Sequence, residues 1–499
     1  MRNTKKITIS NCYLKQSDTR GVCEMKNFYD VVIVGAGPAG IFTALEITNK
    51  RPELSVLIVD KGRSIEKRKC PARENGKCAK CNPCGITFGW SGAGAFSDGK
   101  LSLSPEVGGR LLEYLSEDES KKLIKYCDDI YIKFGANQKI YGLNSDKVDE
   151  IKYEASKYNI RLVECPVRHL GTELAYEVLK SMYHHLMDNT NTEFMELSEV
   201  EEILVEDNKV TGILLKNSEG VFKINAGYVV AAPGRGGAEW ISNEAKKHNI
   251  SVTNNAVDIG LRVEVPNSVM DHLTKDLYEA KLVYYSDTFD SKVRTFCMNP
   301  GGVVSAEYYD DNKIAVVNGH SYSDQKLRTT NTNFAMLVST TFTEPFNQPI
   351  DYGKSIAQLG NMLTGGGIMV QRLGDLLKGS RTDYHRLSKS TTIPTLKSAV
   401  PGDLSFVLPQ RHLTSIVEAL KAFDKIAPGL YSKNTLLYGV EVKFYSSKIS
   451  TNDNFETTIS NLYTIGDGAG ITRGLMQAST TGVIVARDIA KKINLEYLN

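Results

Sequence analysis

One glycine-rich turn constrains the fold of this chain more than any other feature of its sequence. Residues 35–40 read Gly-Ala-Gly-Pro-Ala-Gly and follow an apolar run, Tyr29–Val34, that is typical of a buried parallel strand. Pro38 stands where the next helix would begin, a position at which its missing N–H is harmless. A second apolar run, 55–59, ends at Asp60. This order of strand, glycine turn, helix, strand and acid predicts a βαβ unit of an α/β fold.

The spacing inside the turn is typical of a dinucleotide-binding loop. Gly35 allows the tight turn, Gly37 lets the backbone approach a pyrophosphate, and Gly40 lets the helix pack against the strand. The helix N-terminus would present free N–H groups to the phosphates, and a carboxylate at Asp60 would accept hydrogen bonds from a ribose. The residues expected to contact a dinucleotide here are Gly35, Gly37, Pro38, Ala39, Gly40, Asp60 and Lys61.

The C-terminal end of the chain favours FAD over NAD(P). The segment NLYTIGDGAG places Asp467 just after another apolar run, and a helix is expected to begin near Gly474. A helix N-terminus stabilises the negative charge that reduced flavin carries at N1. The stretch YVVAAPGRGG, 228–237, is a further strand followed by glycine. These segments resemble the FAD fingerprints of the two-dinucleotide-fold flavoproteins, which implies contacts from Gly234, Gly466, Asp467, Gly474 and Leu475.

The sequence has no second G-x-G-x-x-G loop, so no separate NAD(P)H domain is expected. NAD(P)H is therefore considered only as a transient electron donor. A loop of small residues should lie against the flavin ring, because small side chains permit close approach of the backbone to a flat ring. This loop consists of Ser91, Gly92, Ala93 and Gly94 and continues to Lys100.

Six runs of sequence narrow the resemblance: CPARENGKCAKCNPC, GWSGAGAFSDGKLSLS, TFCMNPGG, VNGHSY, LLYGVEVKFYS and IGDGAGITRGLMQAS. Together they resemble a family of bacterial FAD-dependent dehydrogenases, and the resemblance covers the chain from about Phe28 onward. It implies a flavin fold with a distinct C-terminal FAD-dependent domain, and it supplies no substrate. Asn299 stands where many relatives are expected to have a second cysteine, so no cysteine pair is assigned to Cys297.

The expected architecture is an α/β chain with a discontinuous, Rossmann-like FAD/NAD(P)-binding domain and an α+β cap that forms the substrate pocket. Met25 lies just before the start of the fold, and translation from Met25 is expected to give a functional protein. The expected divisions are an N-terminal extension (1–27), the FAD-binding domain (28–256) with a Cys-rich loop (62–103) and a helical insert (104–165), the cap (257–454) and a returning FAD-binding segment (455–499).

Four of the nine cysteines crowd into the Cys-rich loop. Cys70, Cys78, Cys81 and Cys84 have the spacing C-x7-C-x2-C-x2-C, in which thiolates can converge on one metal. The run resembles the ferredoxin pattern for a [4Fe–4S] cluster, and a compact zinc site is the alternative metal centre. Free or redox-active thiols beside the flavin are the interpretation without a metal.

Polar residues of the cap are the candidates for proton transfer. His320 lies in the run NGHSY, and Glu441, Lys443 and Tyr445 share one face of an expected strand by their alternation. A carboxylate beside an ammonium is suited to handling a proton. A solvated strand face would give the same pattern. A lone histidine such as His169 is interpreted as structural.

The composition limits the remaining function classes. A net charge of +2 on 499 residues indicates neither a nucleic-acid footprint nor an acidic surface. The first ten residues lack an apolar h-region, and the stretch 31–45 is shorter than the ~18 residues of a membrane span, so a cytoplasmic location is expected. The sequence therefore predicts an FAD-dependent oxidoreductase that transfers hydride equivalents to or from a small organic molecule, with a redox partner protein as a further candidate contact. A tRNA-modifying flavoprotein and a non-catalytic electron-relay protein are the alternatives.

Overall fold

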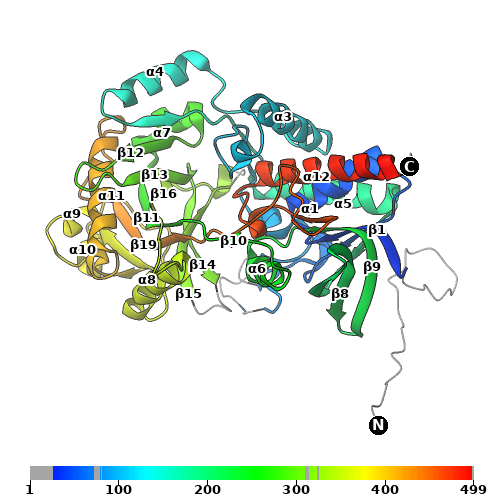
Figure 1. Cartoon of the computed structure of the whole chain (residues 1–499). Coiled ribbons are helices and arrows are strands. Elements are labelled where there is room, and N and C mark those ends of the chain that lie inside the picture. Colours follow the sequence, from blue (N-terminus) through cyan, green and yellow to red (C-terminus); the bar gives the residue numbers. More distant parts are fainter. Residues whose placement is uncertain (1–25, 72–78, 80, 310–313, 323–324, 497–499) are drawn as a thin grey trace, which may run out of the picture.

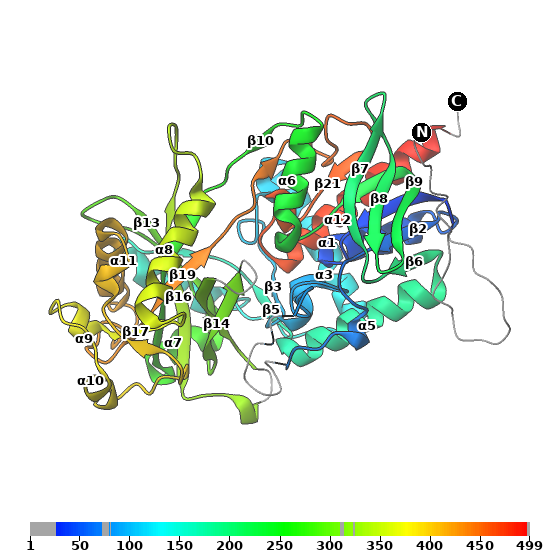
Figure 2. The ribbon, with the colours of Figure 1, turned by 90° about the horizontal axis from the view of Figure 1, so that it is seen from below.

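The structure, a computed structural model, describes residues 26–71, 79, 81–309, 314–322 and 325–496 (Figure 1). The expected N-terminal extension up to Met25 and the expected metal ligand Cys78 lie outside these residues. The described chain forms two lobes that lie side by side, each built around its own sheet (Figure 2). None of its described helices combines the length and apolar character that crossing a membrane requires.

The first lobe contains the predicted βαβ unit. β1 (Phe28–Val34) leads through the glycine turn into α1 (Pro38–Lys50), and β2 (Val56–Val59) returns parallel to β1. The sheet order is β6-β2-β1-β9-β8-β7, with β21 also paired to β9. The strands β6, β2, β1, β9 and β21 run parallel, while β7 and β8 form an antiparallel meander with β9. The added strands are β6 (Thr192–Met195), β7 (Glu199–Glu206), β8 (Lys209–Asn217), β9 (Gly220–Ala231) and β21 (Leu462–Thr464).

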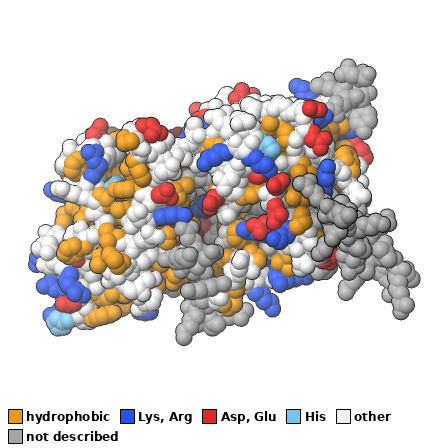
Figure 3. Space-filling view, turned by 60° about the horizontal axis from the view of Figure 1, so that its bottom comes forward, with side chains coloured by type: hydrophobic (Ala, Val, Ile, Leu, Met, Phe, Trp, Pro, Cys, Tyr) orange, Lys and Arg blue, Asp and Glu red, His pale blue; other side chains and the backbone are white. Residues whose placement is uncertain are grey.

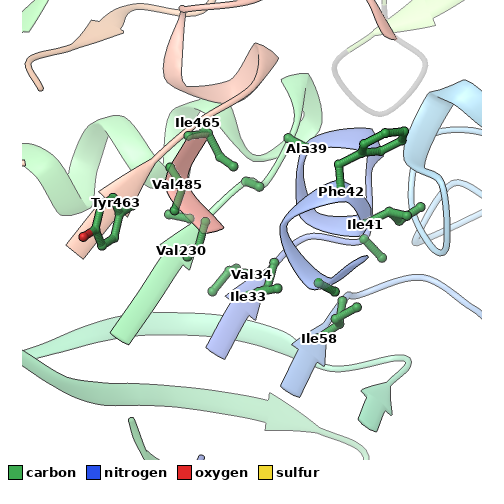
Figure 4. Packing of buried hydrophobic residues seen from close by; sticks show 14 of the residues in the cluster. Ile33, Val34, Ala39, Ile41, Phe42, Ile58, Val230, Tyr463, Ile465 and Val485 are labelled. Atoms are coloured by element: carbon green, nitrogen blue, oxygen red, sulfur yellow. The ribbon is translucent and has the colours of Figure 1, made fainter. Parts of the chain in front are cut away.

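The C-terminal segment completes this lobe. The last helix, α12 (Leu475–Glu496), lies along α1, and a Cβ atom at Gly482 would come 2.3 Å from the carbonyl oxygen of Ala39. Such an approach needs glycine at that position. Figure 4 shows Phe42 of α1, Ile33 of β1 and Val485 of α12 among the buried side chains of this core. The FAD/NAD(P)-binding type of fold and its discontinuity are therefore as predicted, because β21 and α12 join the first 231 residues from the far end of the chain. Its other helices are α3 (Glu117–Lys133), α5 (Gly171–Asn189) and α6 (Ala238–Lys247).

The second lobe is an α+β domain around a mostly antiparallel sheet with the order β18-β17-β19-β11-β16-β13-β12-β4. α7 (Asn267–Leu277), α8 (Pro349–Thr364) and α11 (Gln410–Phe423) contribute buried residues to its core. The short helices α9 (Leu373–Leu376) and α10 (Tyr384–Ser388) lie at the end away from the first lobe (Figures 1 and 2). The strands are β4 (Arg161–Val163), β11 (Val257–Pro266), β12 (Lys281–Tyr285), β13 (Lys292–Asn299), β16 (Asn331–Thr340), β17 (Met369–Arg372), β18 (Val400–Pro401) and β19 (Leu436–Lys443).

The expected helical insert, 104–165, is divided between the lobes. Ser116 accepts a hydrogen bond from the backbone of Glu119, whose side chain accepts one from the backbone of Ser116, and this capping box starts α3 on the first lobe. α4 (Ser145–Ser156) and β4 instead belong to the second lobe, where β4 pairs with β12. This pairing joins residues about 120 positions apart, which is why local periodicity gave no sign of it.

Short two-stranded pairs lie beside the main sheets. β3 (Lys100–Ser102) pairs with β5 (Val167–His169), and β10 (Val252–Thr253) pairs with β20 (Lys448–Ile449). β14 (Val303–Tyr309) and β15 (Ile314–His320) form an antiparallel pair in the second lobe. The 3₁₀ helices used below are η2 (Gly92–Phe96), η4 (Arg235–Gly237), η6 (Leu404–Phe406) and η7 (Asp467–Ala469).

Candidate functional site

The glycine turn after β1 has the close contacts that its sequence predicts. Gly35 has φ +104°, and a Cβ atom there would lie 2.2 Å from the carbonyl oxygen of Ala232. A Cβ atom at Gly40 would lie 2.1 Å from the oxygen of Gly35, so α1 packs directly on the turn. At Gly37, by contrast, a Cβ atom would meet nothing within 4 Å. The first and last glycines are thus required by the protein itself, whereas the middle one borders open space.

Asp60 holds this turn together through its carboxylate. One carboxylate oxygen accepts the N–H of Ala36 at 2.9 Å, and the other accepts the N–H groups of Gly62 and Gly89, both at 2.8 Å. The side chain therefore fixes the turn and the approach to the Ser91–Gly94 loop, and its expected contact with a ribose stays a prediction. The ammonium of Lys61 lies 4.1 Å from the ring centre of Phe88 and 3.4 Å from Glu199.

The Ser91–Gly94 loop packs against the glycine turn at 35–40 and against Leu475, while its expected contact with a flavin ring stays a prediction. The N–H of Ser91 donates to the carbonyl oxygen of Ala36 at 2.6 Å. A Cβ atom at Gly92 would lie 3.5 Å from the Cα of Gly37, and one at Gly94 would lie 3.0 Å from the side chain of Leu475. Residues with larger side chains at Gly92 or Gly94 would collide with Gly37 or Leu475 and push the loop away from them. Ala93 is the exposed residue of the loop.

Ser91 itself is under strain and has an unsatisfied polar group. It has φ +74°, in the left-handed region that residues with a Cβ atom seldom adopt, and it is fully buried. Among the described residues its hydroxyl has no hydrogen-bond partner. A buried hydroxyl without a partner costs free energy, and strained residues concentrate at ligand sites. Both observations fit a bound group that would accept or donate a hydrogen bond at Ser91.

The two distant fingerprint segments meet the same turn. A Cβ atom at Gly466 would lie 3.2 Å from the side chain of Ala39, and one at Gly468 would lie 2.5 Å from the carbonyl oxygen of Gly234. Like Gly37, Gly234 borders open space, with φ +64° and nothing within 4 Å of an added Cβ atom. The structure therefore brings together the predicted contacts at 35–40, 91–94, 234 and 466–475.

Charged groups line this junction. The carboxylate of Asp467 accepts the hydroxyl of Thr472 at 2.7 Å and lies 3.4 Å from the guanidinium of Arg235. Partial desolvation opposes the charge of Arg235, whose side chain is half-exposed, but the neighbouring acidic groups, led by Asp467, together outweigh it and raise the pKa of Arg235. α12 begins at Leu475, directly after Gly474, as the sequence predicts. Its N-terminus thus faces the same junction with its positive dipole end.

The Glu441 side of β19 is buried, so its interpretation as a solvated strand face is wrong. Glu441 is fully buried and accepts two hydrogen bonds from Arg262, both at 2.9 Å, while the ammonium of Lys443 lies 2.8 Å away. Burial favours the neutral acid, but the charges of Arg262 and Lys443 outweigh it and hold the pKa of Glu441 below its usual range. Glu441 is therefore an ionised group that balances two buried cations.

Tyr445 lies where the second lobe meets the start of α12. Its hydroxyl donates to Asp258 at 2.5 Å and accepts from Arg294 at 2.8 Å. The guanidinium of Arg473, the residue before Gly474, lies 3.7 Å from the centre of the Tyr445 ring. Burial, reinforced by the charge of Asp258, raises the pKa of Tyr445, so the phenol is protonated at neutral pH. Tyr445 therefore contacts Arg473, two residues before the start of α12.

A second polar cluster, which the sequence did not single out, surrounds Lys100. Its ammonium lies 3.0 Å from Asp98 and donates to the carbonyl oxygen of Met298 at 2.5 Å and to the side chain of Asn299 at 3.1 Å. Burial opposes the charge of Lys100, but Asp98 leads the carboxylates that raise its pKa. His320 is the last residue of β15. It lies close enough to this cluster for its charge to help lower the pKa of Asp98. Lys100 thus connects the end of the loop that begins at Ser91 to the second lobe.

His169 belongs to the same region and is held by hydrogen bonds to two residues of the second lobe, which agrees with a structural role. Its Nε2 lies 2.9 Å from the hydroxyl of Tyr278 and 3.4 Å from that of Ser321, and the Tyr278 hydroxyl donates to Ser321 at 3.0 Å. Burial lowers the pKa of His169 to about 4, so the ring is neutral at pH 7. Tyr278 has φ +57°, a further strained residue with a Cβ atom. The spacing of these residues, from three distant segments, could not have been read from the sequence.

His169 lines an open cavity of about 1030 Å³ beside the Ser91–Gly94 loop. Ala95 and Phe96, which follow the Ser91–Gly94 loop, form part of its wall. Tyr141 and the α5 residues Leu174 and Tyr176 also line the cavity, and Arg328 lines it from the second lobe. Its lining mixes aromatic and aliphatic side chains with four charged ones, Lys139, Glu173, Glu177 and Arg328, so a small molecule that carries polar groups would fit it.

The predicted metal centre is not tested by the described residues. Cys70 is half-buried, while Cys81 and Cys84 are exposed, and all three are free thiols. Within the described ranges no group of three His, Cys, Asp or Glu side chains could hold a metal ion. Because Cys78 lies outside those ranges, the choice between an iron–sulfur cluster, zinc and free thiols stays open.

Two family models match the chain. Residues 256–444 match the FAD-dependent protein, C-terminal domain-like family, and residues 30–80 match the lycopene cyclase protein family. An uncharacterized protein of Clostridium beijerinckii is 27% identical over 484 residues, which cover 93% of this chain and 81% of that protein. These matches confirm the resemblance to FAD-dependent proteins and, with the fold, support the prediction of an FAD-dependent enzyme.

Solved structures of flavin enzymes are similar at low identity. A 3-ketosteroid-Δ4-(5α)-dehydrogenase of Rhodococcus jostii RHA1 is 13% identical with a TM-score of 0.43, covering 94% of this chain and 98% of that chain. A glycine oxidase of Geobacillus kaustophilus is 12% identical with a TM-score of 0.39, covering 94% of this chain and 95% of that chain. Likeness at this level says nothing about the substrate of this chain.

Proposed function

We propose that this chain is an FAD-dependent oxidoreductase that moves hydride equivalents to or from a small organic molecule. The observation that carries the proposal is the open backbone at Gly37 and Gly234, at the point where the three fingerprint segments meet. The unsatisfied, buried hydroxyl of Ser91 lies in the loop packed on the same turn and supports it further. Bound FAD would supply the hydride chemistry.

Different residues around the opening would contact different parts of the cofactor. The backbone at Gly37 and the N-terminus of α1 would hold the pyrophosphate, and Asp60 would contact a ribose. Asp467 would hold the ribityl chain. The Ser91–Gly94 loop and the N-terminus of α12 would lie against the flavin ring, where the dipole of α12 favours negative charge.

The substrate would enter through the cavity beside Phe96. This cavity borders the flavin loop, and Arg328 contributes to it from the second lobe, which fits the expected role of the cap. Among the expected proton carriers, we assign the role to Tyr445 or His320 and not to Glu441. Glu441 is ionised between two cations, and giving it a proton would leave Arg262 and Lys443 with less compensation inside the protein.

Gly37→Val tests the cofactor site, because the added side chain meets no protein atom within 4 Å of its Cβ and should not disturb folding. It would, however, fill the space assigned to the pyrophosphate. We expect protein with the wild-type circular dichroism spectrum and apo-protein melting temperature but with little bound FAD after reconstitution. Absorbance of the flavin released on denaturation gives the FAD content per chain.

Gly367→Val is the matched control, since a Cβ atom there has only ordinary contacts of 3.8 Å or more and lies in the second lobe. This variant should bind FAD normally. Wild-type FAD content in the Gly37→Val protein would place the cofactor elsewhere and overturn the proposal.

A further inference from the structure

The end of the second lobe carries a surface that its own fold leaves uncovered. It comprises α9, α10, η6 and their connections, residues 372–406, which we call the α10 surface. Three large apolar side chains stand out on it: Tyr384 is 71% exposed, Ile393 64% and Phe406 73%. Tyr384 and Ile393 border one shallow opening of about 290 Å³. Single exposed apolar residues are ordinary, but Tyr384 and Ile393 border the same opening, and Phe406 adds a third strongly exposed apolar side chain from the same segment.

The charge of the same segment is strongly one-sided. Six Lys and Arg residues and three Asp residues lie between 372 and 406. Buried Asp375 pairs with Arg372 and Arg386, so those three charges are largely used within the fold. Within the described chain, no carboxylate pairs with the remaining cations, which are Lys378, Arg381, Lys389 and Lys397.

The other two acids, Asp383 and Asp403, form no ion pair with these cations in the described chain, and six cations against three acids leave the segment with a net charge of +3. Asp383 caps α10 by accepting the N–H of Arg386 at 2.7 Å, and Asp403 accepts the N–H of Ser405 at 3.0 Å. Both carboxylates are therefore engaged with the backbone. All four remaining cations are exposed, and Lys433, which packs beside Gly374 of α9, adds another exposed cation. Figure 3 shows hydrophobic side chains together with Lys and Arg at this end of the molecule, on the left.

We propose that the α10 surface docks on an anionic lipid surface. Peripheral binding of this kind combines insertion of apolar side chains at the headgroup boundary with attraction of Lys and Arg to anionic lipids. Tyr384, Ile393 and Phe406 would supply the first contribution, and the four cations without acidic partners the second. The docked protein would hold its flavin lobe away from the lipid, because α9 and α10 lie at the opposite end (Figures 1 and 2).

Two points bear on the choice between lipid and other acidic partners. Ile393 and the half-exposed Leu377 are aliphatic and suit the headgroup boundary, whereas the rings of Tyr384 and Phe406 suit a lipid interface and a stacked base alike, so tRNA serves as the competing ligand in the test below. A protein that delivers electrons would have to approach the flavin, and this surface lies far from the fingerprint junction in both ribbon views. The inference does not depend on the proposed oxidoreductase activity.

Co-sedimentation of the full chain with lipid vesicles tests the proposal. We expect binding to vesicles that contain phosphatidylglycerol, weakened by salt, and little binding to vesicles of phosphatidylcholine alone. The Lys389→Gln/Lys397→Gln variant should bind anionic vesicles about 25-fold more weakly, at about fivefold for each cation lost. Ile393→Ser/Phe406→Ser should also weaken binding, and the remaining binding should be more sensitive to salt.

Lys122→Gln/Lys223→Gln is the control, because it removes two exposed lysines of the first lobe and leaves the α10 surface intact. It should bind like the wild type, and all variants should keep the wild-type melting temperature. If the control lost as much binding to anionic vesicles as the Lys389/Lys397 variant, the overall charge of the protein would explain the loss, and the α10 surface would have no special role. No binding to anionic vesicles, or binding of tRNA that the Lys389/Lys397 change abolishes while vesicles are ignored, would overturn the proposal.

Discussion

At Glu441 a single carboxylate holds two cations inside the second lobe. Arg262, Glu441 and Lys443 are all at most 7% exposed in their side chains, so none is compensated by bulk water. Replacing one member of such a group leaves the others buried without their partner, which costs far more than the intact group contributes. The residue that the sequence marks as a proton carrier is therefore in a position where stability depends on its charge.

Glu441→Gln should lower the free energy of unfolding by about 3–5 kcal/mol, because both buried cations lose their carboxylate. Chemical denaturation followed by circular dichroism measures it. Tyr445→Phe removes one hydroxyl from Asp258 and Arg294, which still contact each other, and should cost only about 1 kcal/mol. If Glu441→Gln were as stable as Tyr445→Phe, the ion-pair interpretation would be wrong.

At the scale of elements, the contact between α1 and α12 decides whether the fingerprint segments meet. Gln477 of α12 accepts the N–H of Leu111 and donates to the carbonyl oxygens of Pro105 and Val107. These bonds hold the loop 105–111, which precedes α3, against α12. Gly482 lets the two helices approach to backbone contact. The start of α12 is thus positioned by contacts along its whole first half.

Gly482→Ala should separate the two helices, because the added Cβ would lie 2.3 Å from the carbonyl oxygen of Ala39 and 2.8 Å from the backbone nitrogen of Thr43. Overpacking of this kind costs about 1–3 kcal/mol. The variant should melt at a lower temperature and bind FAD more weakly, as calorimetry and flavin fluorescence would measure. Gly367→Ala, which has room for a methyl group, should change neither quantity. A Gly482→Ala protein with unchanged melting temperature would show that the helices can adjust without loss.

For the whole molecule, burial of neutral histidines links stability to pH. Burial lowers the pKa of His169 and of His412 to about 4 each, against about 6.5 in an unfolded chain. Between these values the unfolded state binds more protons than the folded state. The stability contributed by the neutral rings is therefore complete above pH ~6.5 and is lost as the pH falls toward about 4.

We expect the melting temperature to fall as the pH is lowered from about 6.5 to about 4, with up to about 3 kcal/mol lost at each histidine. The His169→Gln/His412→Gln variant should show a flatter dependence over this window, although it is less stable at pH 7. Exposed His385, which has no ion pair with a described acid, is the control position, and His385→Gln should follow the wild-type curve. A double variant with the wild-type slope would assign the acid sensitivity to carboxylates instead.

The dinucleotide fold could be predicted from the amino-acid sequence, because the features that specify it are local. A strand, a glycine turn and a helix with Pro38 at its start are set by the backbone freedom of neighbouring residues, and Gly35 and Gly40 have the predicted contacts. The order of the fingerprints likewise indicated that β21 and α12 return to the first sheet, since parallel strands of this fold place their following loops at one edge.

The pairing of buried polar groups, by contrast, became visible only in the folded chain. Alternation placed Glu441 and Lys443 on one face of β19 but could not show that Arg262 of β11 covers that face and buries it. The hydrogen bonds of His169 could not be predicted, because its partners, Tyr278 and Ser321, are more than 100 residues away in the chain. A pKa depends on burial and on charges within a few ångströms, and these are set by long-range packing rather than by sequence spacing.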